Sequence, residues 1–137
     1  MSSENLLDII GKIREKCLAK EEEIRQVLNL TETEYRGLLC LNRNERITCQ
    51  EFSARMNLSV SRGSRVIDRL YAGGYIDRID LSSDRRCKNI WLTNTGHAVR
   101  NQIDKHRQRC EENLISGYSE TKIRMIKKEL GNLSDKF

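Results

Sequence analysis

The segment that decides the fold runs from Leu58 to Gly96 and reads LSVSRGSRVIDRLYAGGYIDRIDLSSDRRCKNIWLTNTG. Its first third predicts a helix with two unlike faces. At about 100° per residue, Arg62, Arg65 and Arg69 fall within about 60° of one another on one face. The predicted apolar face holds Val60, Ile67, Leu70 and Tyr71. One face can therefore pack against a core while the other meets an anion. In so charged a chain, an ordinary solvated face is the alternative.

A two-stranded hairpin is predicted to follow this helix. Residues 75–81 and 87–93 are rich in aliphatic, aromatic and threonine side chains, which favour strands, and residues 82–86 have the composition of a turn. Arg85 and Arg86 would lie near its tip, where a narrow ribbon can enter the DNA minor groove, whose negative potential attracts arginine. A surface hairpin without a ligand is the alternative. A basic helix followed by such a ribbon has the order of parts of a DNA-binding winged helix.

Asp84 is the acidic residue of this predicted tip. A carboxylate there would repel phosphate unless it were paired with a cation. We therefore expect Asp84 to orient Arg86 and to leave Arg85 free to reach outward.

Two further helices are predicted upstream of the basic helix. The capping box Thr31-x-x-Glu34 begins a helix expected to run to about residue 42. Thr48-x-x-Glu51 is a second capping box, before a third helix over 49–56. Asn57 can end that third helix in a left-handed conformation, and Ser59 can cap the basic helix. The short spacing between these two helices matches the tight turn of a helix-turn-helix.

Both ends of the chain are predicted to form long amphipathic helices, because apolar residues recur there every three or four positions. The stripes include Leu6, Ile10, Ile13, Ile123, Ile126, Leu130 and Leu133. Packing within one chain is the alternative, but we favour dimerisation because a compact lobe over 31–94 hardly needs these helices. The predicted fold is one mainly α domain over 1–137 with a small β-wing. It consists of a winged helix-turn-helix lobe flanked by N- and C-terminal dimerisation helices in 1–30 and 95–137.

Charge is distributed unevenly along the 137 residues. Lys and Arg number 25 against 20 Asp and Glu, and the basic residues outnumber the acidic ones only after residue 42. This localised excess predicts a polyanionic partner, with double-stranded DNA favoured over an anionic membrane surface. No apolar run approaches the roughly 18 residues of a membrane-spanning helix, and the start of the chain lacks the pattern of a secretion signal. A cytoplasmic protein is therefore expected.

The sequence carries no recognisable catalytic or metal-binding motif. It has no nucleophile elbow, phosphate loop or dinucleotide fingerprint, so neither an enzyme nor a cofactor is predicted. Its five cysteines are odd in number and form no CxxC pair, which argues against a disulfide framework or zinc finger and favours small buried hydrophobic residues. His106 and Cys110, four residues apart, could share a metal ion, but a solvated histidine beside a core cysteine is the favoured alternative.

Several short motifs together resemble the MarR family of bacterial and archaeal transcription regulators, over essentially the whole chain. They are Leu58-Ser59-x-Ser61-x-x-Ser64-Arg65-x-x-Asp68-Arg69-Leu70, Gly74-Tyr75-Ile76, Asp77-Arg78, Asp84-Arg85-Arg86 and Leu92-Thr93-x-x-Gly96. The resemblance implies a homodimer with interlocked terminal helices and two lobes in successive major grooves of a near-palindromic DNA site. It also implies that Ser61, Arg62, Arg65 and Arg69 lie on or beside the recognition surface and that Arg85 or Arg86 enters the minor groove. We add the capping residue Ser59 to these predicted DNA contacts.

Two positions depart from the family pattern. Gly63 stands inside the basic helix where the family has a larger residue, and an interior glycine costs about 1 kcal/mol relative to alanine. We expect this glycine to permit close approach of the backbone to DNA. Arg62 replaces a small hydroxyl residue, and both a contact to guanine O6 and N7 and a clamp on phosphate remain open for it.

The same resemblance implies control by an effector. Relatives often bind small ligands between the dimerisation helices and the lobe, although no pocket is visible in this sequence, and some sense peroxides through a cysteine in the first helix, where Cys17 lies. Cys17 is thus a candidate redox sensor beside Lys16 and Lys20, with an inert thiol in the apolar stripe as the alternative. The predicted function is that of a DNA-binding transcriptional regulator, a repressor, that a ligand or oxidation releases. A winged-helix adaptor that binds proteins without specific DNA binding is the competing function.

Overall fold

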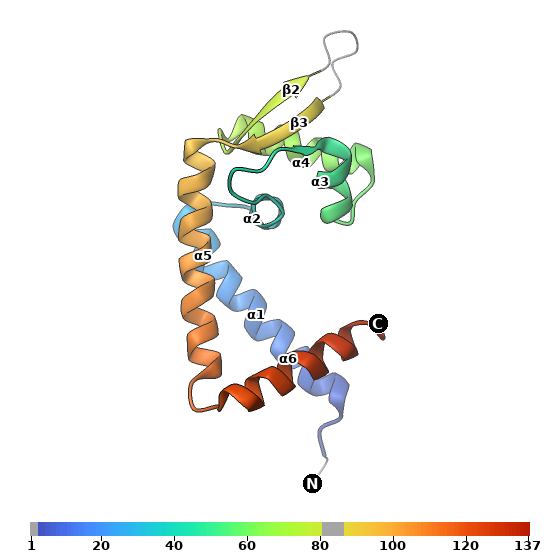
Figure 1. The fold of residues 1–137 in the computed structure, drawn as a ribbon, viewed down its shortest axis with the longest axis vertical. Helices are drawn as coiled ribbons and strands as arrows, with labels where there is room; N and C mark the ends of the chain where they lie inside the picture. The colour runs from blue at the N-terminus through green and yellow to red at the C-terminus, as the bar shows by residue number, and fades with distance from the viewer. Residues whose placement is uncertain (1–2, 81–86) are drawn as a thin grey trace. The chain divides into compact units, whose positions relative to one another are not determined.

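The computed structural model describes residues 3–80 and 87–137. Its elements follow the order α1 (Leu6–Leu28), α2 (Glu32–Leu39), β1 (Ile47–Thr48), α3 (Cys49–Arg55), α4 (Val60–Ala72), β2 (Ile76–Asp80), β3 (Cys87–Leu92), α5 (Asn94–Ile115) and α6 (Glu120–Ser134) (Figure 1). The prediction of a mainly helical winged-helix fold with a small antiparallel sheet is confirmed. The chain forms two compact units, Met1–Asp104 and Lys105–Phe137.

Hydrogen bonds from local side chains begin the helices. Thr31 Oγ1 accepts from the Glu34 N–H at 3.1 Å and Glu34 Oε1 accepts from the Thr31 N–H at 3.0 Å, which confirms the capping box of α2. Thr48 Oγ1 accepts from the Glu51 N–H at 3.0 Å at the start of α3. The Glu51 carboxylate, however, pairs with Arg55 at 3.2 Å, so the predicted second capping box is present only in part.

The turn between α3 and α4 has the predicted form. Asn57 adopts a φ of 57°, in the left-handed region, and the Leu58 N–H donates to the Ser53 carbonyl at 2.9 Å. Ser59 Oγ then accepts from the Arg62 N–H at 3.2 Å and caps α4. These bonds satisfy backbone groups that a helix end leaves unpaired, so the tight turn follows from the local sequence.

Gly63 brings α3 and α4 into close contact. It is buried, and a Cβ atom built on it would lie 1.8 Å from Ser53 Oγ and 2.6 Å from Ser53 Cβ. No side chain can occupy that space without moving α3. The prediction that Gly63 serves the approach of DNA is therefore corrected, because this side of α4 faces α3 inside the lobe.

The sheet has the strand order β1-β3-β2, with both pairs antiparallel. Ile47 lies opposite Ile90, and Ile76 lies opposite Leu92. All four side chains are buried, so one face of the sheet covers the core. Strand β1 was not predicted, because two residues are too few to show an alternating pattern.

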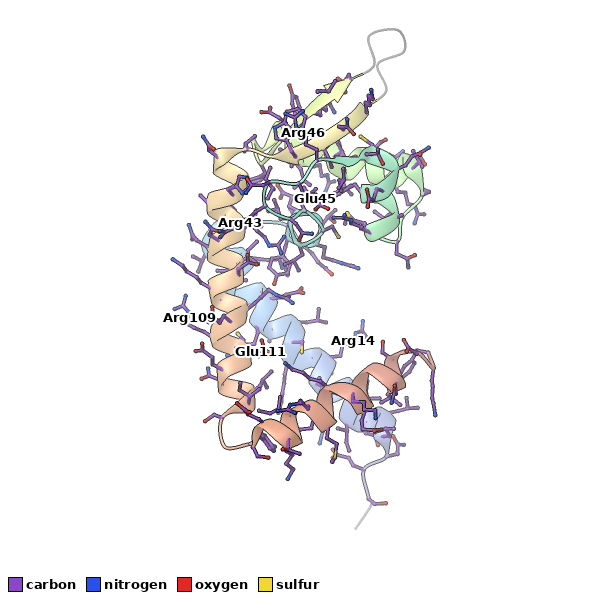
Figure 2. All side chains as sticks on the ribbon, in the orientation of Figure 1. Arg14, Arg43, Glu45, Arg46, Arg109 and Glu111 are labelled. Atoms are coloured by element: carbon purple, nitrogen blue, oxygen red, sulfur yellow. The ribbon has the colours of Figure 1, made fainter. Side chains whose placement is uncertain are left out.

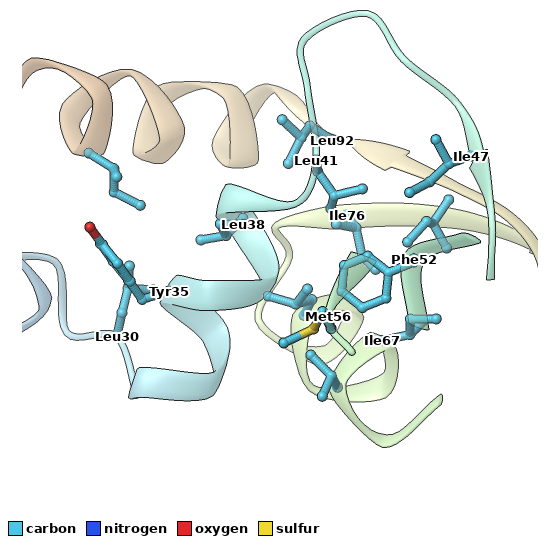
Figure 3. Packing of buried hydrophobic residues seen from close by; sticks show 14 of the residues in the cluster. Leu30, Tyr35, Leu38, Leu41, Ile47, Phe52, Met56, Ile67, Ile76 and Leu92 are labelled. Carbon is cyan, nitrogen blue, oxygen red and sulfur yellow. The ribbon is translucent and has the colours of Figure 1, made fainter. Parts of the chain in front are cut away.

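The core lies between this face of the sheet and helices α2, α3 and α4, and Ile24 of α1 and Ile103 of α5 also belong to it. Leu38 of α2, Phe52 of α3 and Ile67 of α4 are each at most 1% exposed, and they pack in one cluster with Ile76 and Leu92 (Figure 3). Burial of such side chains supplies most of the free energy that favours folding. The core therefore holds α4 with one face inward and the other outward.

The first turns of α5 are joined to the end of α2 by polar contacts. Arg100 donates hydrogen bonds to the carbonyls of Leu38 and Leu39, at 2.8 and 3.3 Å, and also to the carbonyl of Leu41. These carbonyls belong to the last residues of α2 and to the segment just after it. Helix α2 ends at Leu39 and not near residue 42 as predicted.

The cysteines differ from one another in their surroundings. Cys49 is buried and takes part in a disulfide bond, which the sequence analysis did not predict. Cys17 is exposed, and Cys40 and Cys110 are partly buried. Burial raises the pKa of the Cys40 thiol. The expectation that most cysteines are buried is therefore wrong for the four side chains that the structure describes.

Candidate nucleic-acid interface

Helix α4 presents a basic face to solvent. Arg62, Arg65 and Arg69 are exposed, whereas Ile67 on the opposite side of the helix is 1% exposed. In the part of the chain that the structure describes, the three arginines form no ion pair. Their charges are thus available to an external anion.

The predicted apolar face of α4 is correct at two positions and wrong at two. Ile67 and Leu70 are buried, but Val60 and Tyr71 are 54% and 45% exposed. Val60 lies in the first turn of α4 and Tyr71 in the last. Val66, which the sequence analysis did not place on this face, is buried instead.

The first turn of α4 carries hydroxyl groups and no acidic residue. Ser61 is exposed, and its Oγ lies 3.3 Å from the Oγ of Ser59. The N-terminus of a helix also bears a partial positive charge from its aligned peptide dipoles. The turn is therefore suited to a phosphate oxygen.

Arg78 connects the hairpin to α4. Its Nη1 donates to Asp68 Oδ1 at 2.6 Å, its Nε lies 3.6 Å from Asp80 Oδ1, and its guanidinium lies 4.3 Å from the centre of the Tyr71 ring. Asp68 and Tyr71 belong to α4, whereas Arg78 belongs to β2. The sequence analysis quoted Asp68 and Arg78 in separate motifs but did not pair them. The two residues are ten positions apart and belong to different elements, so no local motif reveals the contact.

The predicted wing tip cannot be placed. Asp84, Arg85 and Arg86 lie outside the described residues, as does the predicted pairing of Asp84 with Arg86. The described parts of β2 and β3 do form the hairpin that leads to this tip. Contacts of these three residues with DNA therefore stay predictions.

The loop before β1 is held against α3 by Arg55. Arg55 donates to the two carboxylate oxygens of Glu45 at 2.6 and 3.0 Å and to the Cys40 carbonyl at 2.9 Å. This hydrogen-bonded guanidinium lowers the pKa of Glu45 to about 2. The sequence analysis missed this group, because the two residues are ten positions apart and form no recognisable motif.

The Leu92-Thr93-x-x-Gly96 motif forms the connection between β3 and α5. Thr93 Oγ1 donates to the Gly74 carbonyl at 2.6 Å and accepts from the Gly96 N–H at 3.0 Å. A Cβ atom on Gly96 would lie 2.0 Å from the Tyr75 carbonyl oxygen. Because Gly96 has no side chain, the start of α5 can pack directly against the backbone of Tyr75, which follows α4.

The predicted dimerisation residues are largely accessible in each compact unit. In α1, Leu6 and Ile13 are 55% and 48% exposed, and in α6, Ile126 and Leu130 are 39% and 50% exposed. Ile10, Ile123 and Leu133 are partly buried. A prediction of intramolecular packing would require lower exposure at these positions.

The described residues offer neither a metal site nor a membrane-spanning helix. No group of three or more His, Cys, Asp and Glu side chains in this part of the chain could hold a metal ion. Cys110 Sγ lies 3.9 Å from His106 Nε2, which is a contact between two side chains and not a complete ligand set. No helix within residues 3–80 and 87–137 combines the length and the apolar character needed to cross a membrane.

The order of elements and the capped basic helix define a winged helix-turn-helix protein. A model of the MarR family matches residues 30–88, from the residue before the α2 cap to the start of β3. This match confirms the predicted resemblance to the MarR family over the winged helix-turn-helix lobe.

Individual relatives share this fold over most of the chain. The transcriptional repressor MprA of Escherichia coli (strain K12) is 27% identical over 111 residues, which are 80% of this chain and 63% of MprA, so the match spans less than two thirds of that relative. The uncharacterized HTH-type transcriptional regulator YsmB of Bacillus subtilis (strain 168) is 25% identical over 95% of this chain and 91% of its own length. The crystal structure of Streptococcus pneumoniae FabT in complex with DNA has a TM-score of 0.81 at 22% identity and covers 95% of this chain and 93% of that chain.

Proposed function

We propose that this protein is a sequence-specific DNA-binding transcriptional regulator of the cytoplasm. The observation that carries the proposal is the exposed face of α4, where Arg62, Arg65 and Arg69 form no ion pair with another described residue. A helix of this kind can enter the major groove, with arginine donating to guanine or to phosphate. The DNA complex of FabT supports the proposal, because that protein has the same fold. Ser59, Ser61, Arg85 and Arg86 complete the proposed contact set.

We propose that the protein binds as a homodimer. Apolar side chains of α1 and α6 are exposed, including Leu6, Ile13 and Leu130. Exposed apolar groups in such number favour a partner surface over contact with water. A second copy would supply a second lobe, and a two-fold dimer matches a near-palindromic operator.

Repression that an effector relieves is the proposed mode of control. A protein bound across promoter DNA blocks access of polymerase, and a ligand that favours another lobe spacing releases the DNA. The name of MprA, a transcriptional repressor, supports this direction of control. Oxidation is the second proposed trigger, and the exposed thiol of Cys17 is accessible to it. Treatment with hydroperoxide should then lower operator affinity in the wild type and not in Cys17→Ser.

A pull-down of genomic DNA fragments at two salt concentrations tests the main proposal. We expect a short inverted repeat to be enriched and to survive the higher salt, because base contacts persist when phosphate contacts are screened. Only diffuse, salt-sensitive binding, or none, would contradict the proposal and favour a protein-binding adaptor.

Arginine variants then test the face of α4. Arg65→Ala should weaken binding to the enriched repeat about tenfold or more, since a good base or phosphate contact contributes about 1–3 kcal/mol. Arg107→Ala, which removes an exposed arginine from α5, is the matched control and should leave the affinity unchanged. If Arg65→Ala and Arg107→Ala bound the repeat with equal affinity, α4 would not belong to the DNA-binding surface.

A further inference from the structure

The backbone at the end of α2 is held from outside by arginines of two other helices. Arg100 of α5 donates to the carbonyls of residues 38, 39 and 41, at 2.8 and 3.3 Å for the first two. Arg55 of α3 donates to the carbonyl between them, that of Cys40, at 2.9 Å. Four consecutive carbonyls are therefore bound by side chains of α5 and α3.

The Arg100 side chain is held in the orientation that these bonds require. It is 15% exposed, and its Nε donates to Asp104 Oδ1 at 2.9 Å, about one turn further along α5. The donors of a planar guanidinium have fixed directions, so a bond at Nε also orients Nη1, which donates to the carbonyls. The C-terminal end of a helix carries a partial negative charge, which favours a cation at this position.

Arg55 connects the same backbone segment to α3. It donates to the two carboxylate oxygens of Glu45 at 2.6 and 3.0 Å, and Glu45 lies on the loop that follows α2 (Figure 2). Within α3, Glu51 lies 3.2 Å from the same guanidinium. A shift of the α2 end relative to α3 would therefore break several charge-assisted bonds.

Helix α2 also packs closely against α4, which carries the basic face. A Cβ atom built on Gly37 of α2 would lie 3.0 Å from Leu70 Cδ1 and 3.3 Å from Val66 Cγ1, and both of these buried side chains belong to α4. Close-packed interiors transmit strain because their side chains cannot move independently. Direct contacts therefore lead from Arg100 through the end of α2 to α3 and α4.

Helix α5 has another attachment to the lobe at its start. Thr93 Oγ1 donates to the Gly74 carbonyl at 2.6 Å, and Gly96 packs against the backbone of the residue that follows Gly74. Arg100 lies four residues beyond Gly96, about 6 Å along the helix axis. A helix held at one point can pivot about it, whereas directional bonds at two points fix its direction. Ile103 is also buried, but apolar burial is not directional.

We propose that Arg100 is a positioning residue for DNA binding, which fixes the direction of α5 relative to α3 and α4. Helix α5 continues past Asp104 into the second compact unit. In a homodimer bound to an inverted repeat, a fixed direction of α5 keeps the two basic faces at the spacing of the half-sites. This consequence rests on the proposed function, whereas the orientation of α5 can be measured without DNA.

Residual dipolar couplings of backbone N–H groups test the orientation in the free full-length protein. In the wild type, one alignment tensor should fit the couplings of α4 and of residues 94–104, because both segments belong to the first compact unit. In Arg100→Gln, the two segments should require different tensors, because α5 can then pivot about its first turn. Urea unfolding confirms that the variant is folded.

Duplexes that carry the inverted repeat enriched from genomic DNA test the consequence for binding. Arg100→Gln should weaken binding to the whole repeat about tenfold and keep the affinity for a single half-site within about twofold, because the basic face of α4 is unaltered. It should also lose the preference for the native spacing over repeats with one base pair inserted or removed. A lobe that was merely destabilised would bind the half-site and the whole repeat equally weakly.

Three further variants sharpen the comparison. Asp104→Asn changes a 44% exposed side chain and removes the charge that orients the guanidinium, so it should shift each readout in the same direction to a smaller extent. Arg100→Lys keeps a cation near the carbonyls and should recover part of the loss in Arg100→Gln, because lysine lacks the fixed fork of donors. Arg107→Gln removes an exposed arginine of α5 and should behave as the wild type.

Two results would overturn the proposal. One is a single alignment tensor for both segments in Arg100→Gln and in Asp104→Asn. The other is an equal loss of affinity for the half-site and the whole repeat in Arg100→Gln. If no repeat were enriched from genomic DNA, the proposed regulatory function would fail, and the dipolar couplings would still decide whether Arg100 fixes the direction of α5.

Discussion

Arg78 Nη1 lies 2.6 Å from Asp68 Oδ1, so the hairpin strand β2 is hydrogen-bonded to the helix that carries the basic face. The Arg78 side chain is 23% exposed and that of Asp68 is 66% exposed. A pair so accessible to water contributes only about 0.2–1 kcal/mol to the free energy of unfolding. We therefore expect its main effect to be on the direction in which the hairpin leaves α4.

Loss of this contact should weaken DNA binding more than it weakens the fold. We expect Arg78→Gln to lower DNA affinity about tenfold while the free energy of unfolding falls by about 1 kcal/mol or less. Fluorescence anisotropy with operator DNA and urea unfolding measure the two quantities. Arg124→Gln, which breaks the exposed 3.7 Å pair with Glu120 in α6, controls for the lost charge. If Arg78→Gln and Arg124→Gln bind DNA alike, the pairing of Arg78 with Asp68 does not position the hairpin.

Gly63→Ala should destabilise the protein although alanine favours helices. The added Cβ would lie 1.8 Å from Ser53 Oγ, and relief of such overpacking commonly costs about 1–3 kcal/mol. Urea unfolding should show this loss, and the double variant Gly63→Ala with Ser53→Gly should recover part of it. Gly131→Ala is the matched control, because nothing lies within 4 Å of its Cβ position in α6. It should stabilise by about 0.5–1 kcal/mol. A stabilised Gly63→Ala variant would contradict the close contact of α3 and α4.

Glu45 should contribute to stability only when it is ionised. The hydrogen bond from Arg55 lowers its pKa from 4.5 to about 2 in the folded protein. Because the folded pKa is the lower one, the stabilisation is fully present above pH 4.5 and is lost as pH falls toward 2. The Tm difference between wild type and Glu45→Gln should therefore be constant from pH 5 to 7 and shrink below that range. A difference that stays constant down to about pH 2 would show that protonation of Glu45 does not matter.

Leu130→Glu should convert a dimer to a monomer. Leu130 is 50% exposed in α6, and a carboxylate at an apolar interface is costly to bury. Light scattering after size exclusion should give twice the chain mass of 16.0 kDa for the wild type and one chain mass for the variant. Lys128→Glu, at a charged and exposed position of the same helix, should stay dimeric. A monomeric wild type would contradict the proposed homodimer.

Features that depend on neighbouring residues could be read from the sequence. Thr31 and Ser59 cap their helices by bonds to a backbone N–H three residues ahead, so a short motif predicts them. The spacing of Arg62, Arg65 and Arg69 likewise places them on one face of α4 without knowledge of the rest of the fold. The winged-helix architecture and the basic face were therefore determined by the sequence itself.

Features that depend on distant residues were decided by the tertiary structure. The role of Gly63 was misread because Ser53 lies on another helix, and the pairing of Arg78 with Asp68 spans ten residues. An open hollow beside Trp91 is lined by Asn44 and His97, which are more than fifty positions apart in the sequence. Local patterns report only bonds between near neighbours, whereas packing brings these groups together across the chain. The close contact at Gly63, the orientation of the hairpin and the hollow therefore arise only when the core forms.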